Sequence, residues 1–274
     1  SLVPFKSLLS SEHRIIAVGI YNPVIFDQKV IALENESLAL AANHSAIPVI
    51  DMSQTVDAVI EQCVGYDIDI ILMSCYGKRL PEAIIDLPAA GCYNMHPSLL
   101  PAFRGPEPIF WQMRYAAAVG VSWHMVTHDF DAGDIVTQQA VWLDDGASYN
   151  DISSQLAEAG TRLMHELLAD IDSGDLTGVA QDSASASYYP YPSEHDFVID
   201  INHSAREIYN FMCATRAFVR PYLYQRAGVR FLLDKALDFD PNTTLEATEI
   251  QADRLYITCN EGVLTATYTD KIKI

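Results

Sequence analysis

Basic residues are scarce in this sequence: 17 Lys and Arg stand against 36 Asp and Glu in 274 residues, which gives a formal net charge of −19. Proteins that follow the phosphates of a nucleic acid do so with clustered Lys and Arg. The charge balance therefore argues against broad nucleic-acid binding, while a local basic site is still compatible with it.

Long apolar runs are also absent, and none approaches the roughly 20 residues that a membrane-spanning helix needs. No signal-peptide pattern is visible in these residues. The five cysteines, Cys63, Cys75, Cys92, Cys213 and Cys259, are scattered and lack the spacing of metal ligands. They indicate free thiols in a reducing compartment. We predict a cytoplasmic protein with no membrane partner.

No G-x-G-x-x-G sequence follows a strand candidate, so a dinucleotide-dependent oxidoreductase is not indicated. Half of the residues are hydrophobic and 19% are charged, which is enough apolar material for a sizeable core. The length exceeds that of one usual compact core, so we expect two domains.

Strand and helix patterns alternate in the first half of the chain. Residues 67–73 form a nearly continuous apolar run, typical of a strand buried on both faces of a parallel sheet. This alternation predicts an α/β fold with a parallel-rich, Rossmann-like sheet. The expected strands are 14–21, 47–50, 67–73 and 91–95, and the expected helices are 55–63 and 81–87.

The second half predicts a helix over 107–119, strands over 121–126 and 135–143, and a long amphipathic helix from a capping box at Ser148 to near Gly174. A Ser/Ala/Pro/Tyr stretch then gives the best linker candidate. A helix at 204–215 and short strands at 229–233, 254–258 and 262–268 follow. The predicted parts are a catalytic domain, 1–181, a linker, 182–195, and a small β-rich domain, 196–274.

The densest functional signal lies between Asn94 and Asp134. Asn94 and His96 end a predicted strand, and alternation along a strand points them to the same side. An amide and an imidazole can together donate hydrogen bonds to one developing oxyanion. Asp131 follows His96 by 35 residues, with a permissive glycine at Gly133. If its loop folds over the strand end, Asp131 orients His96 and favours its protonated form.

These residues sit in a longer ordered pattern, which comprises Asn94-x-His96-Pro-Ser-Leu-Leu-Pro101-x-x-Arg104-Gly105, Gly120-Val-Ser-Trp-His124 and Asp131-x-Gly133-x-Ile135. The pattern resembles the 10-formyltetrahydrofolate-dependent formyltransferases. That family includes methionyl-tRNA formyltransferase, glycinamide ribonucleotide formyltransferase, sugar-nucleotide N-formyltransferases and formylation domains of peptide synthetases. The resemblance covers roughly residues 1–180, and the second domain matches more loosely the small OB-like barrel of the methionyl-tRNA enzyme.

The resemblance implies particular roles. Asn94, His96 and Asp131 match the family's catalytic trio: Asn94 and protonated His96 hold the oxyanion, and Asp131 sets the charge of His96 and helps to remove the proton from the attacking amine. The co-substrate is 10-formyltetrahydrofolate and no metal is required. The residues expected to line the pterin pocket are Tyr76, Gly77, Arg79, Leu80, Pro81, Asp129 and Phe130, and those expected to bind substrate are Ser98 and Arg104.

The chain departs from the family pattern at two places. The family begins with a strand and a glycine turn before its first helix, whereas this chain opens with a helix-like segment, so we expect that strand to precede Ser1. The second domain lacks an evident basic face, which weakens a claim on tRNA. We therefore favour an amino-sugar nucleotide or a small or carrier-bound amine as acceptor. The alternatives are methionyl-tRNA, water in a hydrolase, and a non-catalytic folate- or nucleotide-binding module.

Several residues keep a second interpretation. Arg104 could be a surface residue at a helix start, or could anchor a loop or substrate. His124 and His128 invite a metal site, but on a strand they would lie about 13 Å apart, too far to share an ion. Tyr189 and Tyr191 could stack on a base or pack the linker. A locally basic run could be a solvated face or could meet a phosphate: Arg216, Arg220, Arg226, Arg230 and Lys235.

Overall fold

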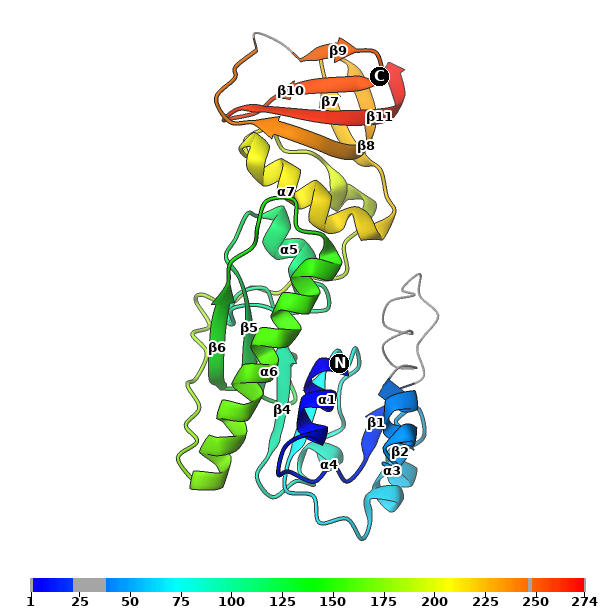
Figure 1. The fold of residues 1–274 in the computed structure, drawn as a ribbon, viewed down its shortest axis with the longest axis vertical. Coiled ribbons are helices and arrows are strands. Elements are labelled where there is room, and N and C mark those ends of the chain that lie inside the picture. Colours follow the sequence, from blue (N-terminus) through cyan, green and yellow to red (C-terminus); the bar gives the residue numbers. More distant parts are fainter. Residues whose placement is uncertain (1, 22–37, 246–247, 274) are drawn as a thin grey trace. The chain divides into compact units, whose positions relative to one another are not determined.

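A computed structural model describes residues 2–21, 38–245 and 248–273 and divides the chain into two compact units (Figure 1). Unit 1 consists of Ser1–Arg104, Gly120–Ala140 and Leu156–Ser187, and unit 2 of Gly105–Val119, Val141–Gln155 and Tyr188–Ile274. The units do not coincide with the predicted ranges 1–181 and 196–274. The difference arises because residues 105–119 and 141–155 group with the C-terminal part of the chain.

Unit 1 begins with a helix and a short parallel strand pair. Val18 aligns with Val49 in that pair, and Val18 packs with Phe5 and Ala42 in a small buried cluster. Thr55 caps the following helix by accepting a hydrogen bond from the N–H of Ala58 at 3.4 Å. These elements are α1 (Leu2–Leu9), β1 (Val18–Ile20), β2 (Val49–Asp51) and α3 (Val56–Cys63).

A four-stranded sheet, in the order β3-β4-β5-β6, carries the rest of unit 1. β3 and β4 are parallel, with α4 (Glu82–Ile85) between them in sequence, and β4 and β5 are antiparallel. The prediction that residues 67–73 are buried on both faces is wrong, because β3 is half-buried at an edge of this sheet, whereas β4 and β5 are mostly buried. The strands are β3 (Ile71–Ser74), β4 (Cys92–His96), β5 (Val119–Met125) and β6 (Ile135–Val141).

The long helix α6 (Tyr149–Ser173) confirms the amphipathic prediction. Ser148 and Asp151 exchange the hydrogen bonds of a capping box, and Gly174 follows the last turn with φ +78°. The indole N–H of Trp123 donates to the carbonyl of Gly160 at 2.8 Å, which fixes β5 to the helix. The predicted apolar stripe is buried throughout: Ile152, Leu156, Ala159, Leu163 and Leu167.

Unit 2 combines two helices with an antiparallel sheet in the order β7-β8-β11-β10-β9. The helix predicted over 107–119 ends early at Arg114, because Ala116 takes a left-handed φ of +49°. Three of the strands were predicted, whereas β7 and β9 were not. The elements are α5 (Pro108–Arg114), α7 (Ala205–Thr215), β7 (Tyr222–Arg226), β8 (Val229–Asp240), β9 (Glu249–Gln251), β10 (Arg254–Thr258) and β11 (Val263–Lys273), with short 3-10 turns at Glu194–Phe197 and Arg216–Phe218.

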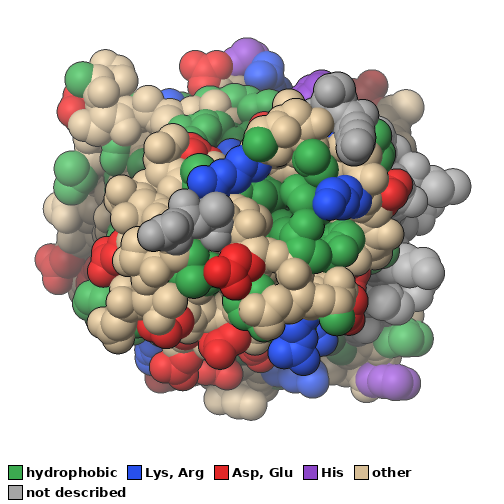
Figure 2. Space-filling model, turned by 90° about the horizontal axis from the view of Figure 1, so that it is seen from above, with side chains coloured by type: hydrophobic (Ala, Val, Ile, Leu, Met, Phe, Trp, Pro, Cys, Tyr) green, Lys and Arg blue, Asp and Glu red, His purple; other side chains and the backbone are tan. Residues whose placement is uncertain are grey.

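Charge on the strand-rich end of unit 2 is mixed. Figure 2 shows Lys and Arg side chains in separate groups, interrupted by acidic and hydrophobic ones. Within the predicted basic run, Arg220 pairs with Glu194 at 3.2 Å and Arg226 donates to Thr248 at 2.9 Å. Among the described residues, the helices are too short or too polar to cross a membrane.

Unit 2 also contains a buried carboxyl group beside the start of α5. Glu107 is 7% exposed, and the hydroxyl of Tyr149 donates to its Oε2 at 3.0 Å. Burial raises the pKa of Glu107 to about 7, because the charged form loses its hydration, and the Tyr149 hydrogen bond offsets this only in part. A carboxyl group with a raised pKa destabilises the folded protein at every pH at which the same group is ionised in the unfolded chain.

We predict that Glu107→Gln stabilises the protein at pH 8 and not at pH 4.5. The folded-state pKa lies above the unfolded value, so stability is lost as pH rises from 4.5 to about 7. The shift corresponds to at most about 3 kcal/mol. Gln removes the charge and keeps an oxygen for Tyr149. Urea unfolding at both pH values measures this, and an equal effect of the substitution at the two would contradict it.

Candidate active site

The antiparallel pairing of β4 and β5 builds the base of the candidate site. Asn94 lies opposite His124 and His96 lies opposite Ser122 in the strand register. His96 is 4% exposed and His124 is 2% exposed. Because side chains two residues apart on a strand share a face, Asn94 and His96 point to the same side of the sheet.

Asp131 closes the site from the loop between β5 and β6. Its φ is +53°, a left-handed conformation that side-chain-bearing residues resist. Its Oδ1 atom lies 3.5 Å from His96 Nδ1 and 3.5 Å from His124 Nε2, and its side chain is 12% exposed. The structure thus brings Asn94, His96 and Asp131 together, and adds His124 as a fourth member.

Hydrogen bonds to backbone carbonyls fix the protonation pattern of both imidazoles. His96 Nε2 lies 2.9 Å from the carbonyl oxygen of Phe103, so Nε2 carries the hydrogen and Nδ1 faces Asp131. His124 Nδ1 donates in the same way to the carbonyl of Met125 at 2.8 Å. Asn94 Nδ2, which can only donate, lies 3.1 Å from His124 Nε2, and this contact orients the amide.

Burial lowers the pKa of His96 below its ordinary value of 6.5. The carboxylate of Asp131 and the hydrogen bond to Phe103 raise it in part, but desolvation of the imidazolium is the larger effect. Asp131 thus acts in the predicted direction, because its carboxylate favours the imidazolium, but the net shift is downward and the protonated His96 that we expected is not the favoured form. At neutral pH the ring is neutral and can take up a proton at Nδ1.

Comparison with known proteins identifies the family. The family model described as formyl transferase matches residues 24–168, more than half of the chain. This chain belongs to the formyl transferase family. A methionyl-tRNA formyltransferase of Desulfotalea psychrophila is 27% identical over 264 residues, covering 96% of this chain and 80% of that protein. One from Synechococcus is 34% identical over 143 residues, covering 52% of this chain and 44% of that protein.

Solved formyltransferase structures share the fold over nearly the whole chain. An N-formyltransferase of Helicobacter canadensis, solved with folinic acid and dTDP-3-aminofucose, is 17% identical with a TM-score of 0.68, and covers 97% of this chain and 94% of its own. The sugar 3N-formyltransferase WlaRD, solved with dTDP and 5-N-formyl-THF, is 16% identical with a TM-score of 0.68, and covers 99% and 94%. These matches support the Rossmann-like α/β fold with a strand-rich C-terminal part.

In this formyltransferase, the two stretches predicted to bind the pterin meet each other. The guanidinium of Arg79, in the loop after β3, lies 5.0 Å from the ring centre of Phe130. Tyr76 packs edge-on against Tyr21, with ring centres 6.3 Å apart. The remaining predicted residues lie in the same two loops: Gly77, Leu80, Pro81 and Asp129. Their contact with folate stays a prediction.

The two residues predicted to bind substrate both have structural partners. Ser98 is fully buried, and its hydroxyl donates to the carbonyl of Ala102 at 2.7 Å. Arg104 donates through Nε and Nη2 to Gln181 Oε1, at 3.1 and 2.7 Å. These contacts favour loop anchoring among the roles open to Arg104, and substrate contact by either residue stays a prediction.

Sequence reasoning missed two members of this site. His124 was considered only as a metal ligand, although its place in the Gly120–His124 motif and on the strand after Asn94 was a usable signal. Gln181 had no signal, because its importance arises from contacts 48 to 77 residues away in sequence. The described residues contain no group of three or more His, Cys, Asp or Glu side chains arranged to hold a metal ion.

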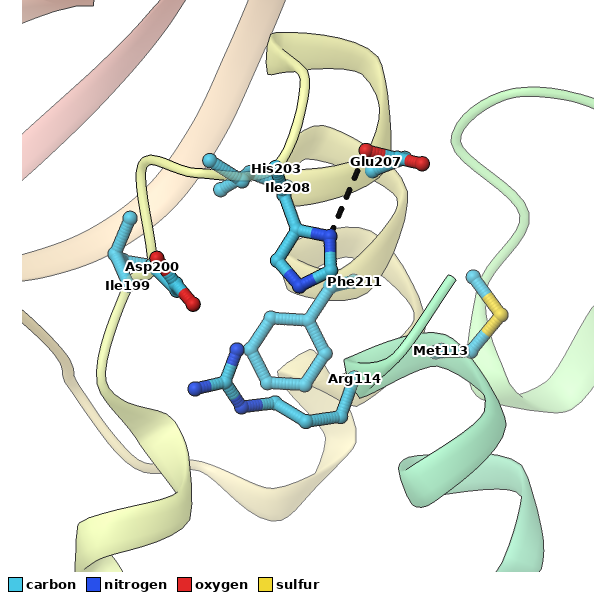
Figure 3. A pocket seen from close by; sticks show the side chains of 8 residues that line it. All are labelled: Met113, Arg114, Ile199, Asp200, His203, Glu207, Ile208 and Phe211. Atoms are coloured by element: carbon cyan, nitrogen blue, oxygen red, sulfur yellow. Dashed lines mark ion pairs between the residues drawn. The ribbon is translucent and has the colours of Figure 1, made fainter. Parts of the chain in front are cut away.

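A second group of titratable side chains surrounds a small hollow in unit 2 (Figure 3). Arg114 stacks on Phe211 at 5.4 Å, and His203 Nδ1 lies 3.6 Å from Glu207 Oε2. Figure 3 shows Asp200 on the other side of this hollow. It contains none of the predicted site residues.

We predict that His96 titrates below pH 6.5 and that Asp131→Asn lowers its pKa further. The neutral amide removes the carboxylate that favours the imidazolium, while the burial of His96 remains. NMR titration of 15N-labelled histidine side chains measures both values, with His96→Gln to assign the signal. A pKa above 6.5 would contradict the dominant effect of burial, and a higher pKa in Asp131→Asn would contradict the effect assigned to the Asp131 carboxylate.

Proposed function

We propose that this formyltransferase moves a formyl group from N10 of 10-formyltetrahydrofolate to a primary amine. The observation that carries the proposal is the convergence of Asn94, His96 and Asp131 in unit 1 of a chain of this family. In the reaction the amine nitrogen forms a bond to the formyl carbon, the bond from that carbon to N10 breaks, and the proton of the amine is finally delivered to N10.

Asn94 supplies the first stabilising contact in this proposal. Its amide nitrogen carries two hydrogens, and the contact with His124 uses one of them. The second hydrogen is the donor we assign to the oxyanion that forms when the amine attacks. Preorganised donors of this kind commonly contribute the largest single catalytic effect.

His96 and Asp131 handle the proton. A neutral His96 with hydrogen on Nε2 accepts the amine proton at Nδ1, directly or through Asp131, whose Oδ1 lies 3.5 Å away. The resulting imidazolium is stabilised by the adjacent carboxylate. The imidazolium of His96 then places a positive charge beside the oxyanion. It donates the proton to N10 when the bond from the formyl carbon to N10 breaks.

The two loops that carry the predicted pterin residues offer donors and acceptors suited to a folate. Gly77 and Arg79 are exposed, so backbone N–H and C=O groups of the loop after β3 are accessible. Phe130 is 43% exposed and adds a flat apolar surface beside Asp131. We assign the pterin ring to these loops, chiefly through backbone hydrogen bonds.

For the acceptor we propose an amino-sugar nucleotide or a small or carrier-bound amine, in the cytoplasm. Residues 1–180 carry 8 basic and 23 acidic groups, and residues 181–274 carry 9 and 13, so both parts are net negative. Binding of tRNA would bring further phosphates against this charge. The five cysteines are not joined in disulfides, which supports a reducing compartment.

Methionyl-tRNA is the second candidate acceptor. It is favoured by the Desulfotalea psychrophila relative, a methionyl-tRNA formyltransferase that aligns with 96% of this chain. The same catalytic residues would serve both acceptors, since each presents a primary amine. The two differ in how much phosphate the protein must meet.

We expect purified protein with 10-formyltetrahydrofolate to release tetrahydrofolate only when an accepted amine is present. The panel contains dTDP- and UDP-linked amino sugars, small amines, methionyl-tRNA and buffer alone, with formylated product followed by mass spectrometry. Exclusive formylation of methionyl-tRNA would replace the preferred acceptor by the second candidate. Formate release without any amine would indicate a hydrolase, and folate binding without turnover would overturn the proposal.

Asn94→Ala and His96→Ala are each expected to lower kcat about 100-fold or more while folate affinity changes little, because both residues act mainly on the transition state. Single-turnover kinetics and calorimetric binding of folinic acid separate these effects. His195→Ala is the matched control, since that residue is exposed and lies outside the residues assigned to the site. Loss of kcat in the control, or retention of it in His96→Ala, would count against the assignment.

A further inference from the structure

The chain segment that follows α6 contacts two loops of the candidate site, the loop after β4 and the β5–β6 loop. We call residues 179–187 the strap. They follow the end of α6 at Ser173, and the first of them, Val179, pairs with Ile135 at the start of β6 (Figure 1). The backbone N–H groups of Val179 and Ile135 each donate to the other's carbonyl, at 2.8 and 2.9 Å. This pair fixes the first part of the strap next to the Asp131 loop.

Gln181 joins the strap to the Asp131 loop and to Arg104, using both polar atoms of its side chain. Its Oε1 accepts two hydrogen bonds from Arg104, at 3.1 and 2.7 Å. Its Nε2 donates to the carbonyl of Asp131 at 2.8 Å and to that of Gly133 at 2.6 Å. A carboxamide has two donor hydrogens and two acceptor lone pairs, so this side chain is saturated.

The backbone that Gln181 holds is one that needs external support. Asp131 has φ +53°, which a residue with a side chain adopts at a cost of about 1 kcal/mol or more. Gly133 lies so close to Met125 that an added Cβ would overlap the carbonyl oxygen of Met125. The position of the Asp131 carboxylate against His96 therefore depends on a conformation fixed from outside the loop.

The far end of the strap acts on His96. Ser187 Oγ accepts a hydrogen bond from the N–H of Phe103 at 2.9 Å, and the N–H of Arg104 donates to the carbonyl of Ser187 at 2.9 Å. Phe103, with φ +59°, presents the carbonyl that receives His96 Nε2–H. One segment thus fixes the partners of both ring nitrogens of His96.

We propose that the strap is a positioning device for the catalytic pair, with Gln181 placing Asp131 and Ser187 placing the Phe103 carbonyl against His96. Both side chains contact backbone groups beside the catalytic pair rather than the side chains of His96 and Asp131. This inference rests on the proposed function, since it gives His96 and Asp131 their catalytic meaning. It also assigns Arg104 a role through Gln181 rather than through substrate.

Gln181→Met tests the first anchor, because it keeps the length of the side chain and removes all four hydrogen bonds. We expect kcat to fall about 10- to 100-fold, as for a small displacement of a catalytic group, with little change in the KM for folate. The pKa of His96, followed by NMR, is expected to fall, because the displaced Asp131 carboxylate raises it more strongly than the released Arg104 guanidinium lowers it, while His124 stays in place. Gln139→Ala, on the exposed part of β6, is the control.

Ser187→Ala tests the second anchor and Ser187→Thr is its conservative counterpart. Loss of the hydroxyl leaves the Phe103 N–H without this acceptor, so we expect kcat to fall in Ser187→Ala and to recover in Ser187→Thr. The melting temperature of each variant is measured alongside. Equal kcat in the two variants would overturn the assignment of Ser187.

A double-mutant cycle decides whether Arg104 acts through Gln181. We expect the loss of kcat in the pair Arg104→Met and Gln181→Met to be smaller than the product of the single losses, because one chain of contacts is broken twice. Multiplicative losses would show that Arg104 acts independently of Gln181 and would overturn this role.

An unchanged His96 pKa in Gln181→Met, with kcat and melting temperature lowered together, would overturn the positioning role. The pKa measurement needs no turnover. If no amine proves to be an acceptor, the proposed function fails while the NMR result still decides how Gln181 acts on Asp131.

Discussion

The site depends on one carboxylate oxygen placed between two buried imidazoles. Oδ1 of Asp131 lies 3.5 Å from His96 and 3.5 Å from His124, and both rings are buried. The negative charge of that carboxylate stabilises a transient imidazolium in this buried site. The antiparallel register of β4 and β5 provides the two rings, and the β5–β6 loop provides the carboxylate.

Local sequence was sufficient for the parts of this arrangement that follow from periodicity. Strand alternation placed Asn94 and His96 on one side, and the apolar stripe of α6 was read correctly over its length. The motif resemblance gave Asp131 its predicted catalytic role and indicated the family. The burial of residues 67–73 was misjudged, because an apolar run does not reveal whether its strand lies at an edge or in the middle of a sheet.

The contacts that complete the site could not be read from the sequence, because they join residues far apart along the chain. Gln181 and Ser187 lie in or beside a stretch whose composition is typical of a linker, yet they bind the backbone around Asp131 and Phe103. The charge state of His96 could not be predicted from the sequence either. A nearby carboxylate argues for the imidazolium, and only the extent of burial shows that desolvation outweighs it.

The placement of the strap has a consequence for how the protein is made. The family model ends at residue 168, and every signature residue of the site has been synthesised by then. The hydrogen bonds that hold the Asp131 loop come from a residue that follows 13 positions later, at Gln181. During translation the motif is thus present before the conformation it requires can be fixed. A fragment cut at the end of the family match would keep every motif residue and lack both anchors.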